Sequence, residues 1–116
     1  GYSSAASDVY KRQGWQRRLS IAMALITEPK ILFLDEPTLG LDVIARRELW
    51  QIINSVKKNV TIVLTTHYME EAEKLSDKVA VMVKGEIKAV GTVSELLQRT
   101  GKQNLEEAFV SIVGVE

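Results

Sequence analysis

The chain contains no cysteine among its 116 residues. This absence excludes disulfide bonds, thiol nucleophiles and cysteine metal sites, and it is compatible with a reducing compartment such as the cytosol. Long apolar runs are also missing: the strongly apolar stretches, such as residues 21–26, are far shorter than the roughly 18 residues of a membrane-spanning helix. There is no excess charge, because 15 basic residues balance 15 acidic ones. The composition therefore shows no broad surface for nucleic acid, and a membrane role requires a partner.

The length and the 46% hydrophobic content suit one domain, or part of one, with its own core. Residues 1–13 differ from the rest, since they are small, polar and without usable periodicity. This segment resembles translated adaptor sequence, and our hypothesis is that it is not native to the protein. The alternative is an ordinary flexible N-terminus.

Regular patterning begins at Gly14 and first predicts an amphipathic helix that Pro29 ends. The apolar face of this helix is expected to hold Leu19, Ala22, Met23 and Ile26. Residues 31–34 form a continuous apolar run, which predicts a strand buried on both faces. Pro37 and Gly40 then indicate a loop.

Helices and strands alternate through the remainder of the chain. Asp42 is predicted to cap a helix that ends near residue 57, with an apolar face of Leu49, Ile52, Ile53 and Val56. Strands are expected at residues 60–64, 79–83 and 86–90, and helices at residues 69–75, 92–99 and from about 105, the last with Leu105, Ala108, Phe109 and Ile112 on one face. The alternation predicts an α/β fold built on a three-layer, mostly parallel sheet with an edge hairpin.

Two adjacent carboxylates, Asp35 and Glu36, follow the first predicted strand. The strand delivers them to the C-terminal edge of the sheet, where ligands of parallel α/β folds bind. Magnesium takes oxygen ligands and keeps several waters, so Asp35 is the candidate metal ligand. Glu36 is the candidate base for an attacking water. The alternative, that both residues only cap a loop, becomes less favourable because of the Pro-Thr-Leu-Gly-Leu-Asp sequence that follows.

Three segments resemble motifs of the ATP-binding cassette family, in that family's order. Residues 34–42, Leu-Asp-Glu-Pro-Thr-Leu-Gly-Leu-Asp, resemble its Walker B motif and D-loop. Residues 14–19, Gly-Trp-Gln-Arg-Arg-Leu, resemble the tail of its signature motif, and residues 65–67, Thr-Thr-His, resemble its switch-histidine loop. The resemblance implies a P-loop NTPase-like fold of the ABC-2 or multidrug type, with a partial ATPase domain at residues 14–100 and a C-terminal helix at residues 101–116.

The resemblance also implies a role for each matching residue. Asp35 corresponds to the magnesium-associated aspartate, Glu36 to the catalytic glutamate and His67 to the histidine that contacts the γ-phosphate. His67 is the only histidine, and the alternative is a packed residue at a strand end. Asp42 corresponds to the D-loop aspartate at the interface of two cassettes, which is compatible with its capping role. Gly14 corresponds to the second signature glycine, which contacts nucleotide at a helix N-terminus.

The residues just before Gly14 depart from the signature motif. Its leucine, serine and first glycine positions are occupied by Lys11, Arg12 and Gln13. If residues 1–13 are not native, these departures are artefacts. Arg17 and Arg18 leave two interpretations open, a solvated helix face or a role in coupling to a partner.

A phosphate-binding loop is missing from the sequence, because none of the seven glycines begins a Gly-x-x-x-x-Gly-Lys-Ser/Thr match. The family's glutamine loop likewise has no candidate before Gly14. We therefore interpret the chain as the C-terminal half of a nucleotide-binding domain.

For the parent protein, the resemblance implies ATP and Mg²⁺ as cofactors and ATP hydrolysis that drives a membrane exporter. It implies a second ATPase domain and a transmembrane permease as partners, no nucleic acid, and a location at the cytoplasmic face of the membrane. One alternative is a soluble relative serving DNA maintenance or translation, although the long heptad runs of the DNA binders are absent. Another is an inactive truncated fragment. The transported substrate does not follow from these residues.

The purified chain is expected to show no ATP turnover, because its sequence lacks the amide nest and the lysine that hold the β- and γ-phosphates. A phosphate-release assay checks this expectation, with a Glu36→Gln preparation as the control for contaminating ATPases. Turnover above that control would contradict the half-domain interpretation.

Overall fold

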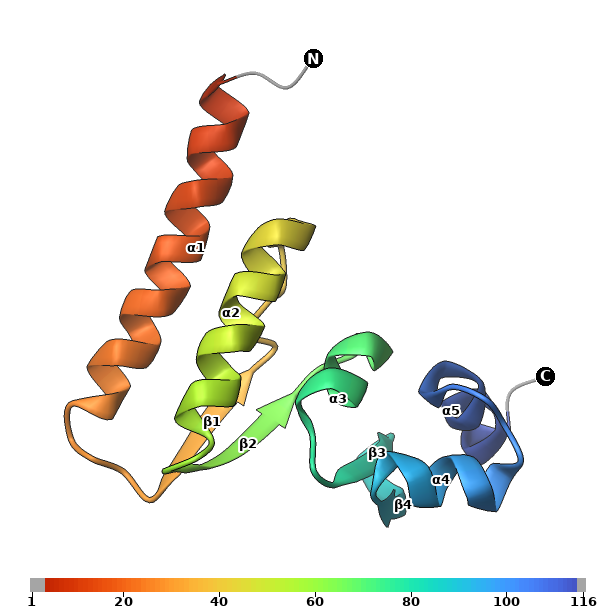
Figure 1. Cartoon of the computed structure of the whole chain (residues 1–116). Coiled ribbons are helices and arrows are strands. Elements are labelled where there is room, and N and C mark those ends of the chain that lie inside the picture. Colours follow the sequence, from red (N-terminus) through yellow and green to blue (C-terminus); the bar gives the residue numbers. More distant parts are fainter. Residues whose placement is uncertain (1–3, 115–116) are drawn as a thin grey trace. The chain divides into compact units, whose positions relative to one another are not determined.

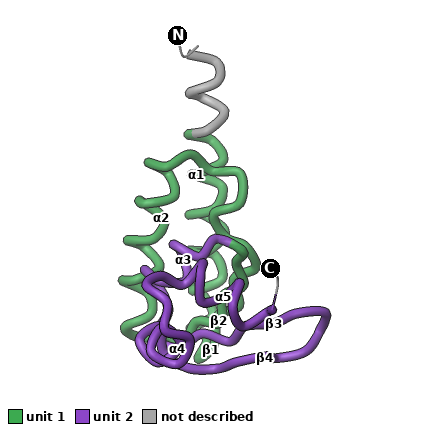
Figure 2. The backbone as a smooth tube through the Cα atoms, turned by 90° about the vertical axis from the view of Figure 1, so that its right-hand side faces the viewer, with its two compact units in different colours: residues 1–67 green, residues 68–116 purple. Residues whose placement is uncertain are grey.

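The computed structural model describes residues 4–114, with side chains described from Lys11 onward. The chain divides into two compact units, residues 1–67 and residues 68–116, which Figure 2 shows in different colours. Each unit has its own helices, strands and buried residues. Among the described residues, no helix has the length and apolar character that a membrane crossing requires.

The first unit pairs two helices with two parallel strands. Its elements are α1 (Ser4–Leu25), β1 (Ile31–Asp35), α2 (Val43–Val56) and β2 (Thr61–Thr65). Figure 1 shows α1 beside α2, and β1 beside β2. The strands pair in register along their whole length, from Ile31 opposite Thr61 to Asp35 opposite Thr65. Both strands therefore end at the same edge of this small sheet.

Helix α1 begins well before the position expected from the sequence. It runs from Ser4, whereas regular patterning begins at Gly14. Residues 4–13 contain alanine, lysine, arginine and glutamine but no proline, so helical propensity is sufficient for the helix to continue through them. Residues 1–3 of the segment hypothesised to be non-native lie outside the described residues, and the origin of the segment stays a prediction.

The predicted apolar face of α1 is wrong. The side chains expected to be buried are exposed: Leu19, Ala22, Met23 and Ile26. Ile21 is buried instead, and so is Gly14. A Cβ atom added to Gly14 would lie 3.7 Å from the Cβ atom of Ala45 on α2. The packed face therefore runs through Gly14 and Ile21, because seven residues are close to two helical turns.

Strand β1 is buried on one face only, in contrast to the sequence prediction. Leu32 is buried, whereas Phe33 is 74% exposed and Ile31 is 52% exposed. Val63, which pairs with Phe33, is also exposed. Paired residues of neighbouring strands point to the same side of a sheet. Ile31, Phe33 and Val63 thus form one apolar face, called here the open sheet face, which the described residues of the first unit leave uncovered.

Helix α2 forms as the sequence predicts. Asp42 has an extended backbone and its side chain accepts a hydrogen bond from the Ala45 amide at 2.8 Å, which is the N-cap arrangement. The buried face holds Leu49, Trp50 and Ile53.

The second unit contains three helices around a β-hairpin. Its elements are α3 (Met69–Leu75), β3 (Val79–Val83), β4 (Glu86–Gly91), α4 (Val93–Thr100) and α5 (Leu105–Val113). Strands β3 and β4 are antiparallel, with an irregularity between Val81 and Met82. Thr92 caps α4 by accepting a hydrogen bond from the Glu95 amide. A parallel strand pair together with this hairpin confirms the α/β class.

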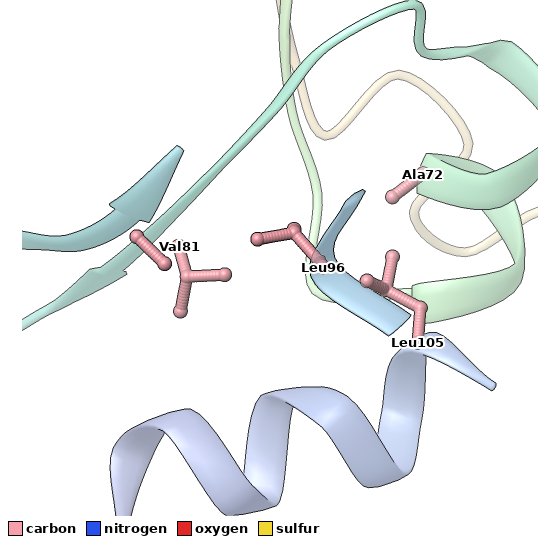
Figure 3. Packing of buried hydrophobic residues seen from close by; sticks show 5 residues of the cluster. Ala72, Val81, Leu96 and Leu105 are labelled. Carbon is pink, nitrogen blue, oxygen red and sulfur yellow. The ribbon is translucent and has the colours of Figure 1, made fainter. Parts of the chain in front are cut away.

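One buried cluster holds the second unit together (Figure 3). Its members are Ala72, Val81, Ala89, Leu96 and Leu105, so every one of the five elements contributes a side chain. Helix α5 thereby packs with α3, α4 and the hairpin. The sequence analysis separated residues 14–100 from a C-terminal helix at residues 101–116 on the basis of motifs, whereas α5 packs into the same cluster as the elements before it. The domain limits of the parent protein stay a prediction.

Leu96→Ala is expected to lower the free energy of unfolding of the second unit by about 2–5 kcal/mol, because this side chain is 1% exposed. Urea denaturation of the chain measures the effect. The control is Val110→Ala on α5, where the side chain is 44% exposed and a change within about 0.5 kcal/mol is expected. Equal destabilisation by both variants would contradict the described core.

Candidate active site

The ends of β1 and β2 place a hydroxyl against the first carboxylate. Asp35 and Thr65 are the last paired residues of the two strands, and the Thr65 hydroxyl donates a hydrogen bond to Asp35 Oδ1 at 2.5 Å. Asp35 is exposed, and within residues 4–114 its carboxylate has no other hydrogen-bond or ion-pair partner. The structure thus places Asp35 at the C-terminal edge of the strands, as the sequence predicts.

Glu36 follows directly in a left-handed backbone conformation, with φ of 44°. This conformation costs a residue other than glycine about 1–3 kcal/mol. The Glu36 amide donates to the carbonyl oxygen of Thr65 at 2.8 Å and also lies 3.2 Å from the Thr65 hydroxyl oxygen. Thr65 therefore holds both carboxylate residues, Asp35 by its hydroxyl and the turn at Glu36 by two acceptors.

The chain's single histidine lies against the second carboxylate. His67 Nδ1 is 2.5 Å from Glu36 Oε1, and the two side chains are 59% and 34% exposed. A carboxylate in its ionised form can only accept a hydrogen bond, and in that form of the pair Nδ1 is the donor. The structure therefore brings together Asp35, Glu36 and His67 on the side of the sheet where both strands end.

This arrangement offers a base and an oxygen ligand that solvent can reach. Within the described part of the chain, no group of three or more His, Cys, Asp or Glu side chains could hold a metal ion. A zinc-type site needs several protein ligands, whereas Mg²⁺ is held by one or two carboxylates together with water and substrate phosphates. The exposed Asp35 carboxylate, with one oxygen engaged by Thr65, fits the second kind of site.

The two remaining predicted residues are placed differently. Asp42 lies at the far end of the loop from Glu36, where its carboxylate caps α2. Gly14 does not lie at a helix N-terminus in this chain, and its contact with nucleotide stays a prediction. It lies inside α1 and is buried beside Ala45, because residues 4–13 extend the helix and occupy the place of a free helix end.

Sequence reasoning gave Thr65 no role of its own within the switch-histidine motif, and it left Arg17 open between a solvated helix face and coupling to a partner. Arg17 donates from Nη1 to the Pro37 carbonyl oxygen at 2.6 Å and from Nη2 to the Leu39 carbonyl oxygen at 2.8 Å. Arg18 instead forms an ion pair with Glu48. No sequence signal reports either contact, because that of Thr65 depends on the pairing register of the two strands and those of Arg17 depend on the path of the loop.

The comparison with family models matches residues 14–72 to a family described as "AAA domain, putative AbiEii toxin, Type IV TA system". Among curated proteins, the chain is 53% identical over 88 residues to ABC transporter A family member 9 of Arabidopsis thaliana, covering 76% of this chain and 9% of the relative. It is 49% identical over 88 residues to the Phospholipid-transporting ATPase ABCA3 of Homo sapiens, covering 76% of this chain and 5% of that protein.

A solved structure of the ATP-binding subunit of an ABC transporter is similar to this chain, with a TM-score of 0.66 and 34% identity. The similarity covers 74% of this chain and 37% of that subunit. The chain thus spans about a tenth or less of the length of the curated relatives and about a third of the solved subunit.

Thr65→Val is expected to accelerate hydrogen exchange of the Glu36 amide about threefold to tenfold, because one of the amide's two acceptors is lost. Thr65→Ser keeps the hydroxyl and is expected to exchange at the unaltered rate. Amide exchange followed by NMR measures the effect, with Thr61→Val at the opposite end of β2 as the matched control. Equal rates in Thr65→Val and Thr65→Ser would show that the hydroxyl does not hold the turn.

Proposed function

The chain belongs to the ATP-binding cassette family of ATPases, and on that basis we propose that it is the water-activating part of an ATP-hydrolysing domain of a membrane transporter. The observation that carries the proposal is the contact of His67 Nδ1 with Glu36 Oε1 at 2.5 Å, next to the Asp35 carboxylate held by Thr65. Membership of the family implies ATP hydrolysis as the reaction, and the side chains at this edge of the sheet are suited to that reaction.

Each group has a chemical role in the proposed reaction. Asp35, together with water and nucleotide phosphates, would hold Mg²⁺, which when bound neutralises charge on the phosphate oxygens. Glu36 takes a proton from the attacking water, since a carboxylate at the turn after the strand can face the terminal phosphate. His67 contacts Glu36 through Nδ1, and it would orient Glu36 and contact the γ-phosphate of the bound nucleotide.

The open sheet face supports a larger ATPase domain around this chain. Ile31, Phe33 and Val63 lie on the same side of the strands as Asp35 and Thr65, because the register alternates sides with period two. Exposed apolar clusters of this kind are typical of surfaces that pack against another structure. We propose that the part of the domain carrying the phosphate-binding loop packs on this face. The phosphates of the nucleotide that this loop binds would then lie near Asp35 and Glu36.

The proposed assembly has two further partners. A second ATPase domain would complete the nucleotide site with its signature motif, and Asp42 would lie at the interface between the two domains. Gly14 would contact the nucleotide bound to the partner domain. This contact requires native residues before Gly14 that begin the helix close to it. A transmembrane permease would hold the pair at the cytoplasmic face of the membrane, and no nucleic acid takes part.

The named relatives refine the class of transporter. They are A-family members, and one is named as a phospholipid-transporting ATPase, so we place the parent protein among A-family transporters. The assignment to the ABC-2 or multidrug type stays a prediction. The alternative is a soluble ATPase of DNA maintenance or translation. A neighbouring segment or gene encoding membrane-spanning helices would favour the transporter, and coiled-coil sequence upstream would favour the alternative.

Glu36→Gln in the complete ATP-binding domain of the parent protein is expected to lower ATP turnover by about 10²- to 10⁴-fold, the usual contribution of a general base. ATP binding should be retained, because the amide keeps the size of the side chain and the binding groups lie elsewhere. Phosphate release and equilibrium binding of a fluorescent nucleotide measure the two effects. The matched control is Glu106→Gln, an exposed position on α5. Unchanged turnover in Glu36→Gln would remove this residue from the catalytic role.

A further inference from the structure

The loop between Glu36 and Asp42 is attached to α1 by one side chain. The Arg17 guanidinium donates from Nη1 to the Pro37 carbonyl oxygen at 2.6 Å and from Nη2 to the Leu39 carbonyl oxygen at 2.8 Å. The two acceptors are 20 and 22 residues away from Arg17 in the sequence. This is a tertiary contact between the helix and the loop, distinct from the ion pair of Arg18 with Glu48 on α2.

Two backbone hydrogen bonds lie within the loop itself. The Leu39 amide donates to the Glu36 carbonyl oxygen at 3.2 Å, and the Leu41 amide donates to the Thr38 carbonyl oxygen at 3.1 Å. Within residues 4–114, the carbonyl oxygens of Pro37 and Leu39 accept hydrogen bonds from Arg17 alone. Without Arg17, these two carbonyl groups would be hydrogen-bonded to water, and no other hydrogen bond among the described residues would join them to α1.

Arginine is suited to this contact by its shape. Its guanidinium is planar, permanently charged and presents donors in a fixed fork, so two acceptors can be held at once. A lysine ammonium is a compact point charge without that fork. The two bonds at 2.6 and 2.8 Å therefore define the loop position relative to α1 more closely than a single ionic contact would.

We propose that Arg17 is a positioning residue that fastens the Pro37–Leu39 segment to α1, so that the helix and the loop from Glu36 to Asp42 move as one body. The inference rests on the proposed function, because it assigns the loop a part in ATP hydrolysis. Gly14 precedes Arg17 by about one helical turn on α1. The Arg17 contact thus joins the signature-like part of the helix to the loop. The proposed water-activating residue Glu36 lies at one end of this loop, and the proposed interface residue Asp42 lies at the other.

The direct test is amide exchange of the loop in the chain itself, without nucleotide. Arg17→Gln is expected to accelerate exchange of the Leu39 and Leu41 amides about tenfold, because charged hydrogen bonds that hold the loop closed are lost. Arg17→Lys, which keeps the charge and the aliphatic stem but not the fork, is expected to give an intermediate rate. Arg18→Gln, the neighbouring arginine on the same helix, is the matched control and should leave both rates unchanged.

The second test is steady-state kinetics of the complete ATP-binding domain of the parent protein. Arg17→Gln is expected to lower kcat about tenfold with KM for ATP changed by less than about twofold, because misplacing Glu36 affects the reacting geometry rather than nucleotide binding. Arg17→Lys should recover part of kcat. Circular dichroism checks that each variant is folded. If Arg17→Gln does not fold, kcat of Arg17→Lys is compared with that of the unaltered domain instead.

Three results would overturn the proposal. These are unchanged loop exchange in Arg17→Gln, equal acceleration in Arg18→Gln, and accelerated exchange without a change in kcat. Absence of ATP turnover in the unaltered complete domain is a different outcome, since it would overturn the proposed function. The exchange rates, which need no nucleotide, would then still decide whether Arg17 holds the loop.

Discussion

The in-register parallel pairing of β1 with β2 is the constraint on which the candidate site depends. It puts Asp35 opposite Thr65, so that the Thr65 hydroxyl reaches one carboxylate while the Thr65 backbone receives the next amide. His67 follows Thr65 by two residues and thereby meets Glu36. A slip of one residue would turn Asp35 and Thr65 to opposite faces of the sheet, and the three groups would no longer meet.

The same register explains why the sheet has two unlike faces. Leu32 is buried, while Ile31, Phe33 and Val63 are exposed on the side that carries Asp35 and Thr65. An apolar surface that leads to a polar edge with two carboxylates is the arrangement expected where another layer packs on the sheet and a ligand binds at the strand ends. This agrees with similarity that covers about a third of a solved ATP-binding subunit.

The loop from Glu36 to Asp42 is held at both ends and in the middle by different kinds of contact. Thr65 holds the left-handed turn at Glu36, Arg17 holds two carbonyl oxygens, and the Asp42 carboxylate caps α2. Each contact is modest in energy. Together they keep a carboxylate residue in a backbone conformation that a residue other than glycine rarely adopts.

Much of this protein follows from its sequence by local rules. The position of Asp35 and Glu36 after an apolar strand and the cap at Asp42 depend on neighbouring residues, and the structure confirms them. The sequence does not determine which face of α1 packs, because apolar residues occur on more than one side of its C-terminal part, with Ile21 buried and Leu19 and Met23 exposed. The contacts of Thr65 and Arg17 were likewise decided by tertiary structure alone, since strand register and loop path join residues about 20 to 30 positions apart in the sequence.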